Sequence, residues 1–154
     1  MNEQVSVSKD VTASADKVWA MVSDVTRMGE WSPENQGGTW LKGASGPVPG
    51  AKFKGRNKIG KRKWSTVATV IDADPGRRFS FRVAAGPMGV ADWAYSFEST
   101  PSGCTVTETW TDRRNGFFKV IAGFITGVKD RASHNRIGME QTLAALAAVA
   151  ESAG

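Results

Sequence analysis

Apolar and polar side chains alternate with a period of two from about residue 37 to residue 112, and this pattern constrains the fold more than any other feature. Strict alternation is typical of β-strands that bury one face. With one further strand near the N-terminus, it predicts strands over residues 4–11, 39–41, 52–59, 64–74, 78–83, 91–99 and 104–112. Short runs rich in Gly and Pro separate them, as expected for turns. The sequence therefore predicts an antiparallel sheet of about seven strands with a single apolar face.

Helical periodicity flanks this region on both sides. Ser14 is placed to cap a first helix, and Gly29 ends that helix or divides it from a short second turn. Near the C-terminus one stripe at helical spacing predicts a long helix, and it is formed by Met139, Leu143, Leu146 and Ala150. Residues 113–128 are apolar but contain glycines, so they are predicted as either a helix or a mobile lid. We expect an α+β fold in which the sheet curls around the C-terminal helix.

Length and composition exclude several classes of protein. The 154 residues suit a single domain over residues 1–154. One cysteine and one histidine exclude a disulfide framework within the chain and a cysteine-based zinc site, and they make a catalytic triad hard to assemble, so we expect no metal and no cofactor. No segment is apolar enough to span a membrane, and the polar start does not resemble a signal peptide. The expected location is therefore the cytoplasm.

The inward-facing positions of the strands are unusually aromatic. The chain has six Trp and seven Phe but only three Leu, at positions 41, 143 and 146. Large rings mixed with glycine, alanine and threonine favour a lined cavity over a close-packed core. Alternatively, the rings fill the interior themselves. The residues expected to wall a cavity are Trp31, Phe53, Trp64, Phe79, Phe81, Trp93, Tyr95, Trp110, Phe117, Phe124 and Met139.

A few polar residues stand among the inward-facing ones. Glu108 faces the same way as its neighbours Val106 and Trp110, where burial would raise the pKa of its carboxyl group. It is a candidate for orienting a ligand or, with Tyr95, for acid–base catalysis. Alternatively, it reaches water near the end of its strand or pairs with an arginine. Asn57 is a second candidate for binding a ligand, or else a residue at a sheet edge.

The single histidine and the single cysteine support no catalytic role. His134 lies off the apolar stripe of the C-terminal helix and is expected to face solvent, whereas Asn135 lies on the stripe and is expected to face the cavity. Cys104 alternates with apolar neighbours and is expected to be a buried structural thiol.

Basic residues concentrate in one part of the sheet. Residues 52–82 contain ten Lys and Arg against two Asp, and the whole chain has a formal net charge of +5. Most of these cations alternate with the aromatic residues and therefore point to the outer face. Such a face attracts nucleic acid or anionic lipid, or serves only solubility and edge protection. The rings lie on the opposite face and give no stacking platform, so a nucleic acid partner is not expected.

The order of these parts resembles a known superfamily. The segments that carry the resemblance are VSVSKDV, ADKVWAMVSDV, MGEWSPE, DADPGRRFSFRV and GMEQTLAALAAVAE. In this order they are similar to the helix-grip superfamily, also called START-like or SRPBCC, which includes the polyketide cyclase/dehydrase family. The resemblance implies a seven-stranded sheet gripping the C-terminal helix, one or two short helices after the first strand, and a tunnel for an apolar ligand.

Three functions follow from the residues and the resemblance. The first is binding of a small hydrophobic molecule, either lipid-like, aromatic or polyketide-like, between the sheet and the C-terminal helix. The second is a polyketide cyclase or dehydratase with Glu108 or Tyr95 as acid or base. The third is a toxin- or stress-type protein that acts on a macromolecular partner through its basic face. A monomer and a homodimer are both compatible with the sequence.

Overall fold

The computed structural model describes residues 3–152, so four terminal residues of the predicted domain (1, 2, 153 and 154) lie outside the described part. The elements are β1 (Gln4–Val11), α1 (Ala15–Ser23), the 3-10 helix η1 (Val25–Glu30), β2 (Asn35–Trp40), β3 (Lys52–Ile59), β4 (Arg62–Asp74), β5 (Arg78–Ala85), β6 (Met88–Thr100), β7 (Gly103–Asp112), α2 (Gly116–Thr126) and α3 (Arg131–Ser152). The strands form one sheet in the order β1-β7-β6-β5-β4-β3-β2, and each pair is antiparallel. The predicted fold is confirmed.

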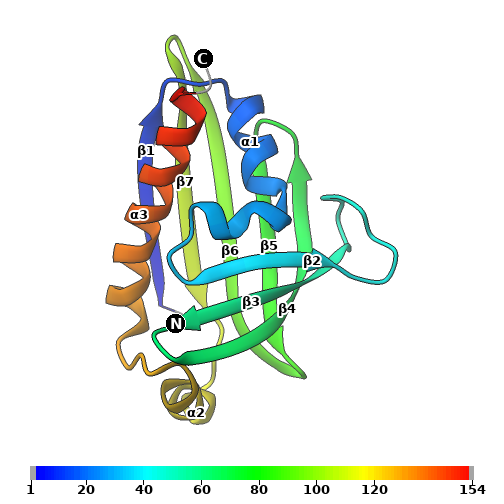
Figure 1. Ribbon diagram of the computed structural model, residues 1–154, viewed down its shortest axis with the longest axis vertical. Helices are drawn as coiled ribbons and strands as arrows, with labels where there is room; N and C mark the ends of the chain where they lie inside the picture. The colour runs from blue at the N-terminus through cyan, green and yellow to red at the C-terminus, as the bar shows by residue number, and fades with distance from the viewer. Residues whose placement is uncertain (1–2, 153–154) are drawn as a thin grey trace.

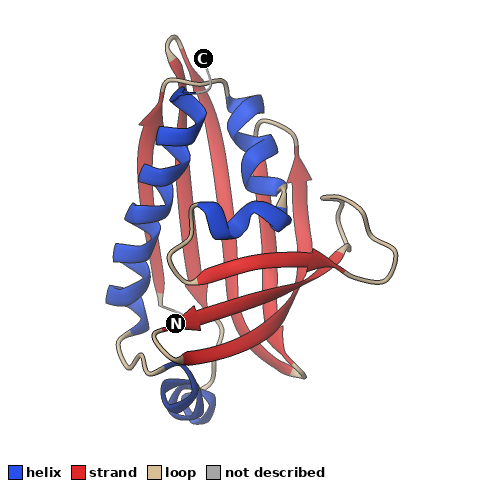
Figure 2. Cartoon of the chain, viewed as in Figure 1, coloured by secondary structure: helices blue, strands red, loops and turns tan. Residues whose placement is uncertain are grey.

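All the helices lie on one side of the curved sheet (Figures 1 and 2). The long helix α3 runs beside β1 and β7, α1 covers the end of the sheet near the C-terminus of α3, and η1 lies between α1 and β2. The short helix α2 lies at the opposite end, next to β4. The predicted apolar stripe of α3 is buried against the sheet and α1, as its residues Met139, Leu143, Leu146 and Ala150 show.

Local signals explain where the elements begin and end. Ser14 caps α1 as predicted, because its side chain accepts a hydrogen bond from the backbone N–H of Lys17. The β3–β4 hairpin turns at Gly60, whose φ of 59° suits a residue without Cβ.

The strand β2 starts earlier than the predicted strand at residues 39–41. Its two central residues are Gly37 and Gly38, which have no side chains to alternate. A Cβ at Gly38 would lie 3.0 Å from the carbonyl oxygen of Val25, so the glycine lets this strand pack closely against η1. Because these two glycines pack through their backbone, the first residues of β2 show no alternation of apolar and polar side chains, and the sequence did not predict them as part of the strand.

Residues 113–128, predicted as either helix or lid, contain the helix α2. The side chain of Asn115 accepts from the backbone N–H of Phe118 and caps its first turn. Gly127, with φ of 78°, ends it in the left-handed conformation. The cap at Gly127 separates α2 from α3, so the apolar run does not extend the C-terminal helix.

Candidate functional site

A cavity of about 280 Å³ opens between the concave face of the sheet, η1, α2 and the first half of α3. Its wall contains most of the residues that the sequence predicted for a ligand site, namely Trp31, Phe53, Asn57, Trp64, Phe81, Trp93, Tyr95, Glu108, Trp110, Asn135 and Met139. The aromatic rings therefore do not fill this half of the interior, which was the alternative interpretation.

Cross-strand pairing places three of the rings side by side. Phe81 pairs with Trp93, and Trp93 pairs with Trp110. Directly opposed residues point to the same face of a sheet, so these rings form a row across β5, β6 and β7. On the neighbouring strands Gly55 of β3 pairs with Thr66 of β4. Gly55 has no side chain and Thr66 has a short one, and both lie in the wall of the cavity.

Three predicted site residues do not line the cavity. Phe79 is fully buried, but it packs beside Phe81 at a centroid distance of 5.7 Å, in the closed end of the core under α1. Phe117 and Phe124 lie on α2 and are 74% and 77% exposed. The prediction was wrong for these residues because parity and composition do not tell how far along a strand the cavity extends, or which face of α2 turns inward.

The inner face of α2 was missed by the sequence analysis. Phe118, Ala122, Ile125 and Thr126 line the cavity instead of Phe117 and Phe124. These four positions repeat at helical spacing. The outer face carries apolar residues at the same spacing, so periodicity alone gave no reason to prefer one face.

Glu108 is the most unusual polar residue of the cavity. It is only 3% exposed, and its Oε2 accepts a hydrogen bond of 2.8 Å from the hydroxyl group of Tyr95, the residue opposite it on β6. Its other oxygen, Oε1, has no hydrogen-bond partner among the described residues. A buried oxygen without a partner costs free energy, so this atom is available to a ligand.

Burial raises the pKa of Glu108 to about 8, although the hydrogen bond from Tyr95 lowers it in part. The pKa of Tyr95 lies well above its usual range because the phenol is buried and Glu108 stands beside it. Both side chains are therefore largely neutral at neutral pH. Since Oε2 already accepts from Tyr95, the acid proton of Glu108 belongs on Oε1.

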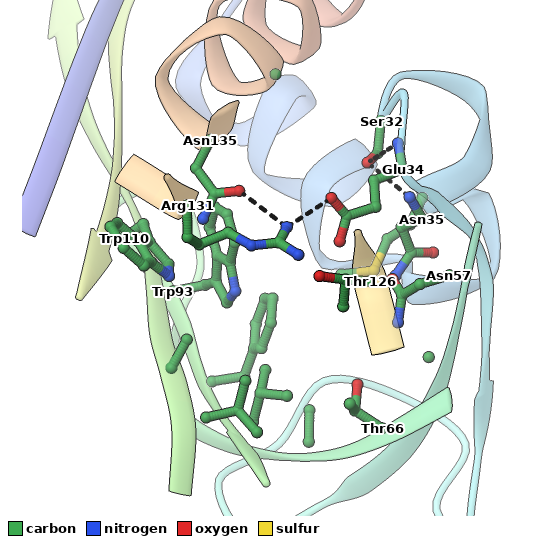
Figure 3. A pocket seen from close by; sticks show the side chains of 18 of the residues that line it. Ser32, Glu34, Asn35, Asn57, Thr66, Trp93, Trp110, Thr126, Arg131 and Asn135 are labelled. Atoms are coloured by element: carbon green, nitrogen blue, oxygen red, sulfur yellow. Dashed lines mark hydrogen bonds and ion pairs between the residues drawn. The ribbon is translucent and has the colours of Figure 1, made fainter. Parts of the chain in front are cut away.

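A polar cluster borders the cavity at the start of α3 (Figure 3). Nη1 of Arg131 lies 2.8 Å from Oε1 of Glu34 and 3.3 Å from Oδ1 of Asn135. Nε2 of His134 lies 3.1 Å from the same glutamate oxygen. His134, predicted to face solvent, keeps 37% of its side chain exposed but also lies in the wall of the cavity. The sequence gave no signal for this cluster, because about a hundred residues separate its two halves.

A second ion pair fixes the chain just before α2. The guanidinium group of Arg114, which lines the cavity, binds the carboxylate of Asp112 through Nε and Nη2, both at 2.9 Å. Burial alone would raise the pKa of Asp112, but the hydrogen bonds from Arg114 hold it below its usual value. The pair therefore stays charged and anchors the loop that leads to α2.

Other candidate chemistry is limited. Within residues 3–152, no three His, Cys, Asp or Glu side chains cluster as metal ligands would. Cys104 is buried and unpaired with another cysteine, and burial raises the pKa of its thiol. In the same described range no helix is long and apolar enough to cross a membrane.

The basic residues of β3 lie outside the cavity. Lys54, Arg56 and Lys58 are exposed on the outer face, while the alternating residues Phe53 and Gly55 are buried. This separation agrees with the parity expected from the sequence. Whether a partner binds this face stays a prediction.

Comparison with protein families shows the family of the chain. The sequence profile of the family described as "Polyketide cyclase / dehydrase and lipid transport" matches residues 2–151. The chain belongs to this family. Among solved structures, the polyketide-cyclase-like protein Cgl2372 from Corynebacterium glutamicum is 35% identical, with 98% of this chain and 93% of that chain covered and a TM-score of 0.67. A search of functionally curated proteins finds no match.

More distant members of the fold are also similar. The di-domain ARO/CYC protein StfQ of the steffimycin biosynthetic pathway is 14% identical, with 99% of this chain and 51% of that chain covered and a TM-score of 0.75. The protein Ara h 8.0201 is 11% identical, with 99% of both chains covered and a TM-score of 0.70. At these identities the likeness shows the shared helix-grip fold.

Proposed function

We propose that this family member binds a small hydrophobic molecule that carries a neutral oxygen, such as a carbonyl group, at its inner end. The observation that carries the proposal is the pairing of an aromatic cavity with one buried, unpartnered oxygen, Oε1 of Glu108. Apolar pockets with a few convergent polar atoms are the usual form of small-molecule sites. The family description, which includes lipid transport, supports the same class of ligand.

Glu108 would orient the ligand as a hydrogen-bond donor. With its pKa near 8, the carboxyl group is protonated at neutral pH, and Tyr95 occupies Oε2. The proton on Oε1 then points to an acceptor, which favours a ketone, ester or quinone oxygen over an anionic carboxylate. The row of Phe81, Trp93 and Trp110 would contact the flat or apolar body of the ligand.

The expected affinity follows from the area that a guest can bury. Removing about 300 Å² of apolar surface from water contributes roughly 7 kcal/mol at about 25 cal/mol per Å². Alone, this contribution corresponds to a dissociation constant of about 10 μM. Association entropy opposes binding by several kcal/mol and a hydrogen bond to Glu108 adds only about 1 kcal/mol, so we expect dissociation constants between about 10 μM and about 1 mM.

Tryptophan fluorescence and native mass spectrometry test this proposal with three probes that carry a neutral carbonyl oxygen: the ester methyl oleate, the flavonoid naringenin and the anthraquinone emodin. We expect at least one probe to bind with one-to-one stoichiometry. Thr66→Phe, which fills the cavity from β4, should abolish binding, whereas the matched control Val67→Phe, on the exposed face of the same strand, should not. Absence of binding by every probe, or equal binding by both variants, would contradict the proposal.

A second candidate function is cyclisation or dehydration of a polyketide-like substrate. Two observations favour it: Glu108 has a raised pKa and a tyrosine hydroxyl 2.8 Å away, which suits a general acid at neutral pH. On this hypothesis Glu108→Gln abolishes turnover of a poly-β-ketone substrate while leaving its binding within a few-fold. If the variant turns over the substrate at the wild-type rate, Glu108 has no catalytic role.

A further inference from the structure

The outer face of α2 is an exposed apolar surface. Phe117, Val120, Ile121 and Phe124 follow one another at helical spacing and are 74%, 63%, 39% and 77% exposed. The opposite face of the helix closes the cavity. Large apolar side chains grouped on one exposed helix face are uncommon on a protein surface that binds nothing. The face therefore needs an occupant.

Cations surround this apolar face. Residues 113–129 contain Arg113, Arg114, Lys119 and Lys129 and no carboxylate. The tip of the β3–β4 hairpin, residues 58–63, contains Lys58, Lys61, Arg62 and Lys63 and again no carboxylate.

The hairpin tip and α2 are in direct contact. Nη1 of Arg62 donates a hydrogen bond to the backbone carbonyl of Phe124 near the end of the helix. A Cβ built at Gly127 would also lie 2.8 Å from Nε of Arg62. Figure 1 shows α2 at one end of the molecule beside this hairpin, at the end opposite α1. The apolar face and the cations therefore form one surface, which we call the α2 surface.

Acidic neighbours compensate the charge of the α2 segment in part. Asp112, which is almost fully buried, binds Arg114 and lies 3.7 Å from Nζ of Lys119, and Asp92 lies 3.3 Å from Arg113. Asp130 caps the first turn of α3 by accepting hydrogen bonds from Ser133. Within residues 3–152, no carboxylate lies within ion-pair distance of the hairpin residues Lys61 and Lys63.

Charge complementarity decides between possible occupants. A second copy of the chain would bring the same cations against one another, and like charges at close range oppose association. Nucleic acid would bind the cations but leave the exposed phenylalanine rings in water. A bilayer that contains anionic lipids satisfies both, because its headgroups attract lysine and arginine while the acyl boundary accepts the rings.

We propose that the α2 surface docks on the surface of an anionic lipid bilayer. The helix has 11 residues, too few for the about 20 that a membrane span requires, so α2 lies in the plane of the interface. Phe117 and Phe124 insert below the headgroups, and the hairpin cations contact lipid phosphates. The helix that closes the cavity is then the element in contact with the membrane. This proposal does not depend on the identity, or the existence, of a cavity ligand.

Vesicle flotation of the purified full chain, without a ligand, tests the proposal. We expect binding to phosphatidylcholine vesicles with about a quarter phosphatidylglycerol and little binding to pure phosphatidylcholine. Raising salt from about 0.1 M to about 0.5 M should weaken binding, because the cations are exposed.

Two pairs of variants separate the apolar and the ionic contributions. Phe117→Ser/Phe124→Ser should reduce binding by at least about tenfold, whereas Val48→Ser/Ile71→Ser, which removes exposed apolar side chains elsewhere, should not. Lys61→Gln/Lys63→Gln should reduce binding by about 25-fold, or about fivefold per cation, whereas Lys42→Gln/Lys54→Gln should change it less than twofold. All eight side chains are exposed, so folding should be unaffected, as circular dichroism would check.

Three results would overturn the proposal. The first is no flotation of the wild-type chain with anionic vesicles. The second is wild-type flotation of the phenylalanine variant, which would reduce the surface to a general attraction of charge. The third is a wild-type chain that floats with no vesicle, is a dimer by light scattering, and becomes a monomer in the variant Phe117→Ser/Phe124→Ser. That result would assign the apolar face to self-association.

Discussion

Replacing Glu108 by Gln is expected to stabilise the protein increasingly as the pH rises. The folded state raises the pKa of Glu108 from its ordinary value of 4.5 to about 8 by burying it. Between these two pH values the unfolded chain has lost the proton that the folded chain keeps. The contribution of Glu108 to the free energy of unfolding is therefore fully present below about pH 4.5 and is lost as the pH rises to about 8. Glutamine has the same shape and carries no titrating proton, so the variant lacks this loss.

The size of the effect follows from the separation of the two pKa values. A difference of about 3.5 pH units at about 1.4 kcal/mol per unit gives a total of about 5 kcal/mol, of which about 4 kcal/mol falls between pH 5 and pH 9. All other titrating groups contribute equally to both proteins. The difference in free energy of unfolding between Glu108→Gln and wild type should therefore grow by about this amount over that range.

Urea unfolding followed by tryptophan fluorescence at several pH values measures this difference. Tyr95→Phe provides a control with the opposite sign, because the hydrogen bond from Tyr95 lowers the pKa of Glu108. Its removal should extend the pH-dependent loss of stability to higher pH. Parallel pH profiles for wild type and Glu108→Gln would refute the reasoning, since they would mean that Glu108 titrates alike in the folded and unfolded chain.

Three further predictions concern stability and reactivity. Ser14→Ala removes the cap that accepts from Lys17 and should lower the free energy of unfolding by about 1 kcal/mol in urea titrations, a loss that Ser14→Asp should avoid. Gly29→Ala would place a Cβ 2.8 Å from the carbonyl oxygen of Gln36, so we expect about 1–3 kcal/mol of destabilisation in the same assay; an unchanged midpoint would show that η1 can shift. Cys104 should react with Ellman's reagent only after denaturation, because the thiol is buried and burial raises its pKa; rapid reaction of the native chain would show an opening that exposes β7.

The sequence predicted those parts of the structure that a local period encodes. Alternation placed β3 at its observed bounds and turned Phe53 and Gly55 inward. The same rule applied to β7 placed Glu108 between two buried apolar neighbours, which is where its carboxyl group lies. Because a strand period assigns each residue to a face, it could identify the polar residues that point into the interior. It could not say which inward positions stay unfilled, and Phe79 was wrongly assigned to the cavity for that reason.

Contacts between distant parts of the chain were beyond such reasoning. Glu34 contacts Arg131 and His134, which lie about a hundred residues away in the sequence, and no local spacing predicts these contacts. The contact of Arg62 with the end of α2 is of the same kind. These contacts depend on how far the sheet curls, which is decided by the whole packed interior and not by any one segment.

The helix α2 shows how an ambiguous pattern can itself carry information. Its residues are apolar on both faces, so the period could not tell which of Phe117 and Phe118 turns inward. In an ordinary surface helix the polar residues show which face is exposed to water, and the opposite, apolar face is then predicted to be buried. Here Phe118 lines the cavity and Phe117 is exposed, and both side chains favour an apolar environment. Only one face of α2 can pack against the rest of the protein. The other face stays exposed and lies beside the hairpin cations of the α2 surface. The apolar residues on both faces of α2 therefore favour contact with an external apolar phase, the membrane proposed above.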